Sequence, residues 1–250
     1  MIQIVPLEGI PEISPGADIV ALILAAAQQT QWALKPLDTV VIAQKIISKA
    51  EGRIVSLSSV TPSPRALELA AQCRKDARLV ELVLGESTEV VRCAPDILIV
   101  RHRLGFIVAN AAIDQSNVES GDDHALLLPM EPDESARRIS EALSAVVGGT
   151  VSVIINDSFG RPWRRGTCGV AIGCAGVESV ADLRGRPDRF GRKLLTSELA
   201  VADEIAAAAS LAMGQANEGY PCVVIRGLTP SGKSLPASAL LRPAHTNLFT

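Results

Sequence analysis

The segment from Asp133 to Ser158 reads DESARRISEALSAVVGGTVSVIINDS and carries the strongest fold signal in the chain. Glu134 to Val147 has the apolar spacing of an amphipathic helix, with Asp133 as its cap and Gly148-Gly149 as its end. Val151 to Ile155 is a nearly continuous apolar run rich in β-branched residues, typical of a strand buried on both faces. A helix followed directly by a buried strand predicts an α/β fold.

The same two patterns recur along the chain and predict a mixed α/β fold. Four further strands, also expected to be buried on both faces, are predicted at Thr39 to Ala43, Ile97 to Val100, Gly105 to Asn110 and Cys222 to Ile225. Three further helices are predicted at Ala17 to Gln28, at Pro64 to Lys75 behind a Ser63 cap, and at Glu198 to Met213 before Gly214.

No repeat or linker divides the chain. We therefore expect residues 1–250 to form a single domain, built either as one unit or as two closely packed lobes. The residues from Pro230 onwards include three prolines, and they predict a tail that wraps around this domain.

The composition excludes several classes of protein. The chain is 48% hydrophobic and 20% charged, which is typical of a compact globular protein and not of a disordered one. A formal net charge of -3 offers no general attraction to nucleic acid. Because the sequence has no secretion signal and no apolar run approaching about 18 residues, we expect a cytoplasmic protein without membrane contact.

The cysteines and histidines argue against a soft metal site. The five cysteines form no C-x-x-C pair, and the three histidines lie far apart in the sequence. The cysteines are therefore interpreted as buried thiols, and any bound metal is expected to have oxygen ligands.

Two acidic residues follow apolar strand-like runs. Asp114 lies in the segment from Asn110 to Asn117, and Asp157 follows Val153-Ile-Ile-Asn and precedes Ser158. Ligands of α/β proteins gather at strand ends, and two carboxylates with a neighbouring hydroxyl or amide oxygen suit Mg²⁺ or Mn²⁺. The alternative is that each aspartate only caps a turn or a helix.

Basic residues stand close to both strand ends. Arg161, Arg164 and Arg165 form the densest cluster, directly after Asp157, which suits a phosphate-bearing ligand; a solvated loop is the alternative. Lys45 and Lys49 follow the strand that ends at Ala43 and share one face if this turn is helical. Lys49 could reach a terminal phosphate, although lysines at this spacing often form only a solvated face.

Residues 227 to 234 read GLTPSGKS and match the phosphate-loop pattern G-x-x-x-x-G-K-[ST]. That motif requires a helix that begins at Lys233-Ser234, but Pro236 lies near its start and no later strand offers an acidic residue for a metal. A nucleotidase centred on Lys233 is therefore kept as an alternative, not as the main prediction.

Several ordered blocks resemble the coenzyme F420:L-glutamate ligase family, also called the gamma-glutamyl ligases, and the resemblance spans almost the whole chain. The blocks are Pro6 to Pro11, Ile47 to Arg53, Asn110 to Val118, Asp157 to Gly169, Ala202 to Ala206 leading to Met213-Gly214-Gln215, and Pro221 to Gly227. No second domain follows, so the chain resembles the stand-alone form of the family.

This resemblance implies a two-lobed, intertwined homodimer that ligates L-glutamate to the carboxylate of the F420 precursor. GTP would be consumed with two Mg²⁺ or Mn²⁺ ions, with potassium as an assisting cation, and the carboxylate would pass through an acyl phosphate. A rival from another class is a sensor that binds nucleotide or deazaflavin without ligation. The number of glutamates added, the exact acceptor and the metal used in the cell do not follow from the sequence.

The resemblance also implies roles for individual residues. Those matching metal contacts are Asp114, Asp157, Ser158 and Gln215. Those matching nucleotide-binding segments are Gly9, Ile10, Pro11, Glu12, Gln44, Lys45, Lys49, Asn117, Met213, Gly214, Gln215, Ala216, Asn217, Glu218 and Gly219. The predicted catalytic residues are Lys49, Asp157, Arg161, Arg164 and Arg165.

Two departures from the family stand out. Gln44-Lys45 replaces small hydroxyl residues, which bears on the preference for the nucleotide base. Residues 121 to 124 form a short insertion.

Overall fold

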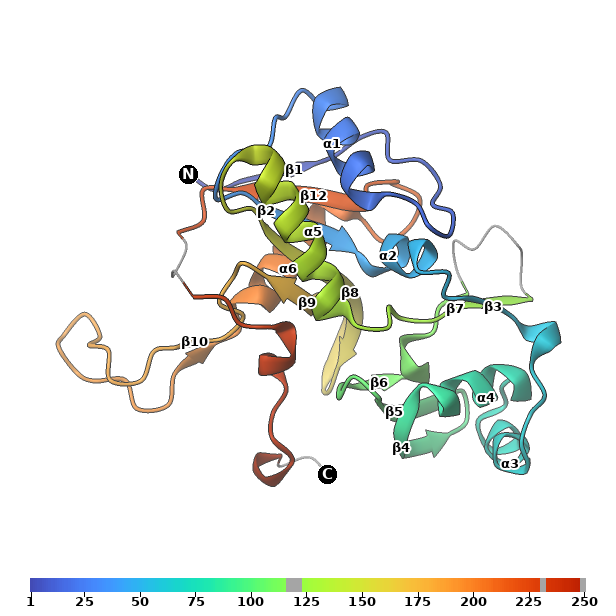
Figure 1. The fold of residues 1–250 in the computed structure, drawn as a ribbon. Helices are drawn as coiled ribbons and strands as arrows, with labels where there is room; N and C mark the ends of the chain where they lie inside the picture. The colour runs from blue at the N-terminus through green and yellow to red at the C-terminus, as the bar shows by residue number, and fades with distance from the viewer. Residues whose placement is uncertain (116–122, 230–232, 248–250) are drawn as a thin grey trace.

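The structure is a computed structural model that describes residues 1–115, 123–229 and 233–247 (Figure 1). Its largest sheet has the strand order β1-β12-β2-β8-β9. The bounds are β1 (Gln3–Pro6), β12 (Cys222–Arg226), β2 (Thr39–Ala43), β8 (Ser152–Arg161) and β9 (Arg164–Ala175). Only β2 and β8 run parallel to each other; the other neighbours are antiparallel.

Helices cover both faces of this sheet (Figure 1). α1 (Ile19–Gln29) and α5 (Pro132–Val147) share one apolar cluster with Val40 and Ile42 of β2, and α6 (Val201–Met213) packs in another with Val41. Successive side chains of a strand point to opposite faces, so the continuous apolar runs are used on both sides. The predicted two-sided burial is therefore confirmed for the strands at Thr39 to Ala43, Val151 to Ile155 and Cys222 to Ile225.

A second, antiparallel sheet has the order β4-β5-β6 and packs against two helices. Its elements are α3 (Pro64–Cys73), α4 (Ala77–Gly85), β4 (Ser87–Ala94), β5 (Ile97–His102) and β6 (Ile107–Ala109). Leu98 and Val100 of β5 are buried, whereas Ile97 is 40% exposed. The prediction of two-sided burial is thus wrong for this strand, because only one of its faces meets helices. The strand predicted from Gly105 to Asn110 is the shorter β6, and the prediction of two-sided burial is wrong for it as well, since Ile107 is 41% exposed.

Short elements connect these parts. They are α2 (Gln44–Ala50), β3 (Ile54–Ser56), η1 (Leu57–Ser59), η2 (Asn110–Ala112), β7 (His124–Leu126), β10 (Ala181–Asp182), β11 (Glu198–Leu199), η3 (Ala237–Leu240) and η4 (Ala244–Thr246). Among the residues described, no helix is both long enough and apolar enough to cross a membrane.

Three predicted helix starts are wrong. The helix expected from Ala17 begins at Ile19, behind an Asp18 cap. The helix expected from Glu198 begins at Val201, because Glu198 pairs with Asp182 in a small ladder. α5 begins at Pro132, so Asp133 lies in its first turn and is not its cap. The carboxylate of Asp133 instead accepts hydrogen bonds from the amides of Cys174 and Ala237, at 2.9 and 2.7 Å.

Strand β9 lies at the edge of the large sheet, where unpaired amides invite association with other strands. Asp133 accepts a hydrogen bond from the β9 amide of Cys174, and Asp203 of α6 accepts one from the β9 amide of Ala171, both at 2.9 Å. The tail also contacts this edge, since the Cys174 thiol of β9 donates to the carbonyl of Leu235 at 3.0 Å. The predicted wrapping tail is confirmed for residues 234–241, which also contact Asp133 and Gly105.

The helices approach β9 closely at glycines. A Cβ atom at Gly169 would lie 2.3 Å from Ser210 Oγ and 2.6 Å from the carbonyl oxygen of Ala206, both on α6. One at Gly173 would lie 2.4 Å from the carbonyl of Pro132 on α5. Real Cβ atoms do not approach so near, so these two positions require glycine.

Candidate active site

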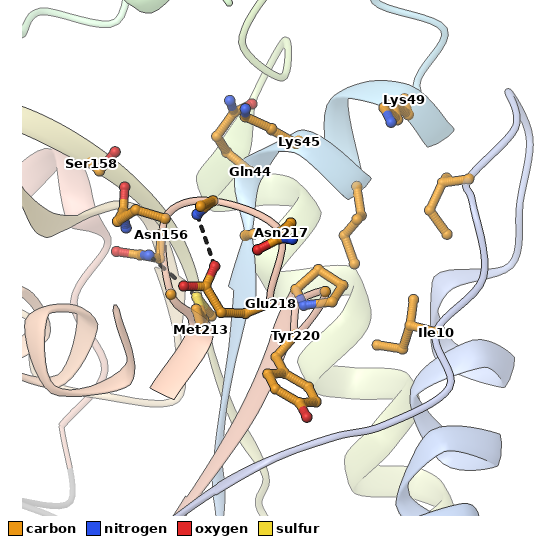
Figure 2. A pocket seen from close by; sticks show the side chains of 18 of the residues that line it. Ile10, Gln44, Lys45, Lys49, Asn156, Ser158, Met213, Asn217, Glu218 and Tyr220 are labelled. Atoms are coloured by element: carbon orange, nitrogen blue, oxygen red, sulfur yellow. Dashed lines mark hydrogen bonds between the residues drawn. The ribbon is translucent and has the colours of Figure 1, made fainter. Parts of the chain in front are cut away.

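A cavity of about 630 Å³ opens where β2 ends and its pairing with β8 stops (Figure 2). Their pairing stops at Ala43 and Asn156. Five segments line the cavity: residues 10–13, residues 43–46 with Lys49, Asp114, residues 156–158, and residues 213–221. Ligands of α/β proteins bind at such strand ends, and the volume lies in the range of small-molecule sites.

Asp157 lies within β8, one residue beyond the last pair with β2, and not past the end of the strand as predicted. Burial raises the pKa of its carboxyl to about 6; the amide of Ser158, which donates to Oδ1 at 2.8 Å, lowers this pKa. The negative charge of Asp114 raises it further and the positive charge of Lys45 lowers it. The two aspartates predicted from separate segments are therefore brought to one place.

Asp114 follows a strained turn. Asn110, Ala111 and Ala112 have φ values of 52°, 53° and 53°, a left-handed conformation that costs about 1–2 kcal/mol for each residue other than glycine. Beyond the turn, Asp114 and Leu126 exchange two backbone hydrogen bonds, of 3.0 and 2.8 Å. These bonds fix the backbone of Asp114 at the wall of the cavity.

The two lysines of α2 each pair with a different carboxylate. Lys45 Nζ lies 2.5 Å from Asp114 Oδ2, and the side chains of both are a little over one quarter exposed. Lys49 is buried and forms an ion pair with Glu12, whose side chain is half exposed. The alternative of a solvated lysine face is therefore wrong for Lys49. Gln44, at the start of α2, is also buried and accepts a hydrogen bond from Ser48.

The loop after α6 forms another wall of the cavity (Figure 2). α6 ends at Gly214, whose φ is +72°, and a Cβ atom there would lie 2.2 Å from Glu218 Cδ. The Glu218 carboxylate accepts a hydrogen bond from the amide of Ala216 at 2.8 Å, which lowers the pKa of this carboxyl. Glu218 thus folds the loop back on itself, and all of residues 213–221 line the cavity.

Most of the predicted site residues line this one cavity. They are Ile10, Pro11, Glu12, Gln44, Lys45, Lys49, Asp114, Asp157, Ser158, Met213, Gly214, Gln215, Ala216, Asn217, Glu218 and Gly219. Gly9 lies beside it without lining it, because Gly9 packs against Gln29 of α1. Asn117 lies outside the described residues.

The three arginines lie elsewhere. Arg161 and Arg164 flank the two-residue turn of the β8–β9 hairpin, with Arg165 next to them, and none of the three lines the cavity. The turn exposes Trp163 by 83%. The assignment of these arginines to a phosphate or a substrate stays a prediction.

Sequence reasoning missed Asn156 and Tyr220, which also line the cavity. Asn156 is buried; its Nδ2 donates to Ser210 Oγ at 3.1 Å, while its Oδ1 has no partner among the described residues. A buried acceptor without a donor is costly, and such atoms are enriched where ligands bind. Its position directly before Asp157 was the only signal in the sequence.

The donor set suits a hard cation that is shared with a ligand. Among the described residues, no group of three His, Cys, Asp or Glu side chains is arranged to hold a metal ion. Mg²⁺ is commonly held by only one or two carboxylates together with water and substrate phosphates. Asp114 and Asp157, with the hydroxyl of Ser158 nearby, match that pattern.

The phosphate-loop pattern lacks its structural context. Residues 230–232 lie outside the described part, and no helix begins at Lys233 or Ser234. The first helical residues beyond them form the short 3-10 turn from Ala237 to Leu240. The Lys233 side chain is 74% exposed, and its Nζ lies 3.6 Å from Glu178 Oε1. The predicted failure of this motif is confirmed for the described residues.

Comparison with known proteins gives one consistent family. Residues 9–227 match the family model described as F420-0:Gamma-glutamyl ligase. The chain is 46% identical to the coenzyme F420:L-glutamate ligase of Methanothermobacter thermautotrophicus, over 99% of this chain and 98% of that protein. It is 42% identical to the ligase of the same name from Methanopyrus kandleri (99% and 96% covered) and 43% to that from Archaeoglobus fulgidus (93% and 90%).

Proposed function

The chain belongs to the F420-0:gamma-glutamyl ligase family, and from that premise we propose that it uses GTP to join L-glutamate to the carboxylate of the F420 precursor. The observation that carries this proposal is the meeting of Asp114, Asp157, Lys45 and Lys49 at one cavity between strand ends. Two carboxylates and two ammonium groups around one space suit a ligand with several phosphates and its counter-cations.

The chemistry requires an activated carboxylate, because a carboxylate cannot expel oxide when an amine attacks it. In the proposed reaction an oxygen of the precursor carboxylate attacks the γ-phosphorus of GTP, and GDP leaves. The amine of glutamate then attacks the acyl phosphate, inorganic phosphate departs, and the amine loses a proton as the amide forms. Phosphoryl transfer of this kind depends mainly on positioning and on neutralising negative charge.

The residues of the cavity can be assigned to these tasks. We assign the nucleotide to the space between residues 10–12, α2 and the loop 213–219, with Asn117 as a further contact. Lys49, buried on α2, would neutralise charge on the terminal phosphates. Arg161, Arg164 and Arg165 would have to reach a phosphate or the precursor from the hairpin tip, because they lie outside the cavity.

Divalent cations are part of this proposal. Asp114, Asp157, Ser158 and Gln215 would hold two Mg²⁺ or Mn²⁺ ions together with the phosphates, and potassium would assist as a monovalent cation. When bound, such ions withdraw electron density from the phosphate oxygens and lower the barrier to transfer.

A homodimer is proposed on the same premise, with two lobes in each protomer. Its support in this chain is the exposure of large apolar side chains away from the cavity: Trp163 (83%), Phe190 (90%), Leu195 (82%) and Leu211 (87%). Large apolar groups left in water favour association with a partner surface. The molar mass in light scattering after size-exclusion chromatography tests this part. We place the reaction in the cytoplasm, where nucleotide is supplied.

The deciding experiment measures phosphate release from GTP with Mn²⁺, with and without the glutamate-free precursor and L-glutamate, followed by mass spectrometry. A product heavier by one or more glutamyl units, dependent on both substrates, supports the ligase. GTP binding without any glutamate-dependent phosphate release would favour the sensor instead. The number of glutamyl units and the base preference are read from the same product masses and from parallel reactions with ATP.

A further inference from the structure

Lys45 lies beside the two carboxylates to which the metal is assigned. Its ammonium nitrogen is 2.5 Å from Asp114 Oδ2, a short charge-assisted contact, and its charge also acts on Asp157. All three side chains line the same cavity as the loop that ends α6. Lys45 therefore occupies the position of a counter-cation for these acids.

An ammonium and a divalent cation at this place are in conflict. Together with two carboxylates they leave one positive charge in excess in a partly buried space, and like charges repel strongly where water is scarce. Nucleotide phosphates would reverse the balance, because they supply negative charge to both cations. The four-carbon stem of a lysine is flexible enough to turn its ammonium from a carboxylate to a phosphate in the same cavity.

Lys49 provides an internal comparison. It stands one helical turn further along α2 and lines the same cavity, yet its ammonium pairs with Glu12 and not with either aspartate. Replacing Lys49 by a neutral residue removes one positive charge from the cavity lining, as replacing Lys45 does. A comparison of variants of the two lysines therefore distinguishes an effect of the Lys45–Asp114 contact from a general effect of positive charge in the cavity.

We propose that Lys45 and the divalent cation compete for Asp114, so that the cation binds tightly only after a nucleotide phosphate has taken over the Lys45 ammonium. Lys45 is then a positioning residue that couples the two binding steps, so that the nucleotide binds before the metal. The inference rests on the proposed function for the presence of both ligands.

The test is Mn²⁺ binding, followed by electron paramagnetic resonance of free Mn²⁺, with and without a non-hydrolysable GTP analogue. Without nucleotide, Lys45→Gln is expected to bind Mn²⁺ about five- to tenfold more tightly than wild type. The reason is that Mn²⁺ no longer has to displace the partly buried ion pair between Lys45 and Asp114. With the analogue bound, Lys45→Gln and wild type are expected to bind Mn²⁺ equally well. The factor by which nucleotide tightens Mn²⁺ binding, and the equal factor by which Mn²⁺ tightens nucleotide binding, are therefore both about five- to tenfold smaller in the variant.

Two variants serve as controls, and circular dichroism checks that each is folded. Lys45→Arg keeps the charge and is expected to stay near wild type without nucleotide. Lys49→Gln is expected to change Mn²⁺ binding by less than about threefold, because it leaves the Lys45–Asp114 pair in place.

The outcomes separate this inference from the proposed function. If Lys45→Gln binds Mn²⁺ no more tightly than wild type without nucleotide, or if Lys49→Gln gains as much, the competition is overturned while the metal site stands. If wild type binds no Mn²⁺ with or without the analogue, both the metal site and the competition are overturned.

Discussion

Replacing Asp157 by asparagine is expected to abolish ligation and at the same time to stabilise the fold. The carboxyl of Asp157 has its pKa raised from 3.8 to about 6, chiefly by burial. A raised pKa means that the ionised form is disfavoured in the folded protein. The penalty is therefore fully present above pH 6 and is relieved as the pH falls towards 3.8, where the unfolded chain also becomes protonated.

The size of this penalty follows from the shift. About two pKa units correspond to roughly 3 kcal/mol, which is an upper limit because Asp157 retains some contact with solvent. Asparagine keeps an oxygen that can accept from the amide of Ser158, so no hydrogen bond needs to be lost. We expect Asp157→Asn to raise the free energy of unfolding by about 1–2 kcal/mol at pH 8, or Tm by roughly 2–8 °C.

The assay is urea or thermal unfolding of both proteins in EDTA, at several values between pH 4.5 and 8. The gain is expected to shrink as the pH falls through 6. In a separate series without EDTA and with a non-hydrolysable GTP analogue present, added Mn²⁺ should further stabilise only the wild type. Asp182→Asn is a suitable control, because Arg184 holds the pKa of Asp182 at about 2, so this variant should not share the gain at pH 8. A stability difference that stays constant across this pH range would refute the reasoning.

Three further predictions concern other parts of the chain. Lys233→Ala should leave kcat/KM for GTP within about twofold of wild type, whereas a nucleotidase centred on this lysine would lose its turnover. Gly169→Ala should lower the free energy of unfolding by more than about 2 kcal/mol, because its methyl group would collide with α6. The control Gly160→Ala lies in the same hairpin with open space around it and should be nearly neutral. Equal losses of stability in urea unfolding of the two variants would contradict this account. Arg74→Gly should stabilise by about 0.5–1 kcal/mol, since Arg74 ends α3 in the left-handed region (φ 56°); a lower urea midpoint would argue against it.

The sequence predicted best those elements whose pattern depends on local burial. The strands at Thr39 to Ala43 and Val151 to Ile155 have apolar residues on both faces, and the two-sided burial predicted from this pattern is confirmed for them. Strand β9 was missed because its first half, RRGTCG, has neither apolar continuity nor alternation. Its place in the sheet is set by pairing with β8 and by the close packing of two helices on its glycines, which are tertiary effects.

The same distinction applies to the site. Asp114 and Asp157 could be selected because each follows an apolar run, and the structure brings them to one cavity. The partners of the lysines could not be foreseen, since Glu12 and Asp114 are distant from α2 in the sequence. Adjacency in sequence did not determine position in space either, because Arg161, Arg164 and Arg165 lie at the hairpin turn and do not line the cavity that Asp157 lines.

Several unfavourable features of this structure lie in the segments that carry the two aspartates, although others lie elsewhere, such as the left-handed Leu37 and Trp32 Nε1, which is buried without a partner in the described part of the chain. Asp114 follows three left-handed residues, Asp157 is a carboxyl with a raised pKa, and the amide oxygens of Asn110 and Asn156 are buried without a partner among the described residues. Each feature opposes folding, and the fully buried strands β2, β8 and β12 beside them offset the cost. Strained residues and unpartnered polar atoms in native proteins are often retained where they serve a ligand site, and we interpret those beside Asp114 and Asp157 in this way. They are the expected cost of holding two carboxylates close together for a cationic ligand, and ligand binding should relieve part of it.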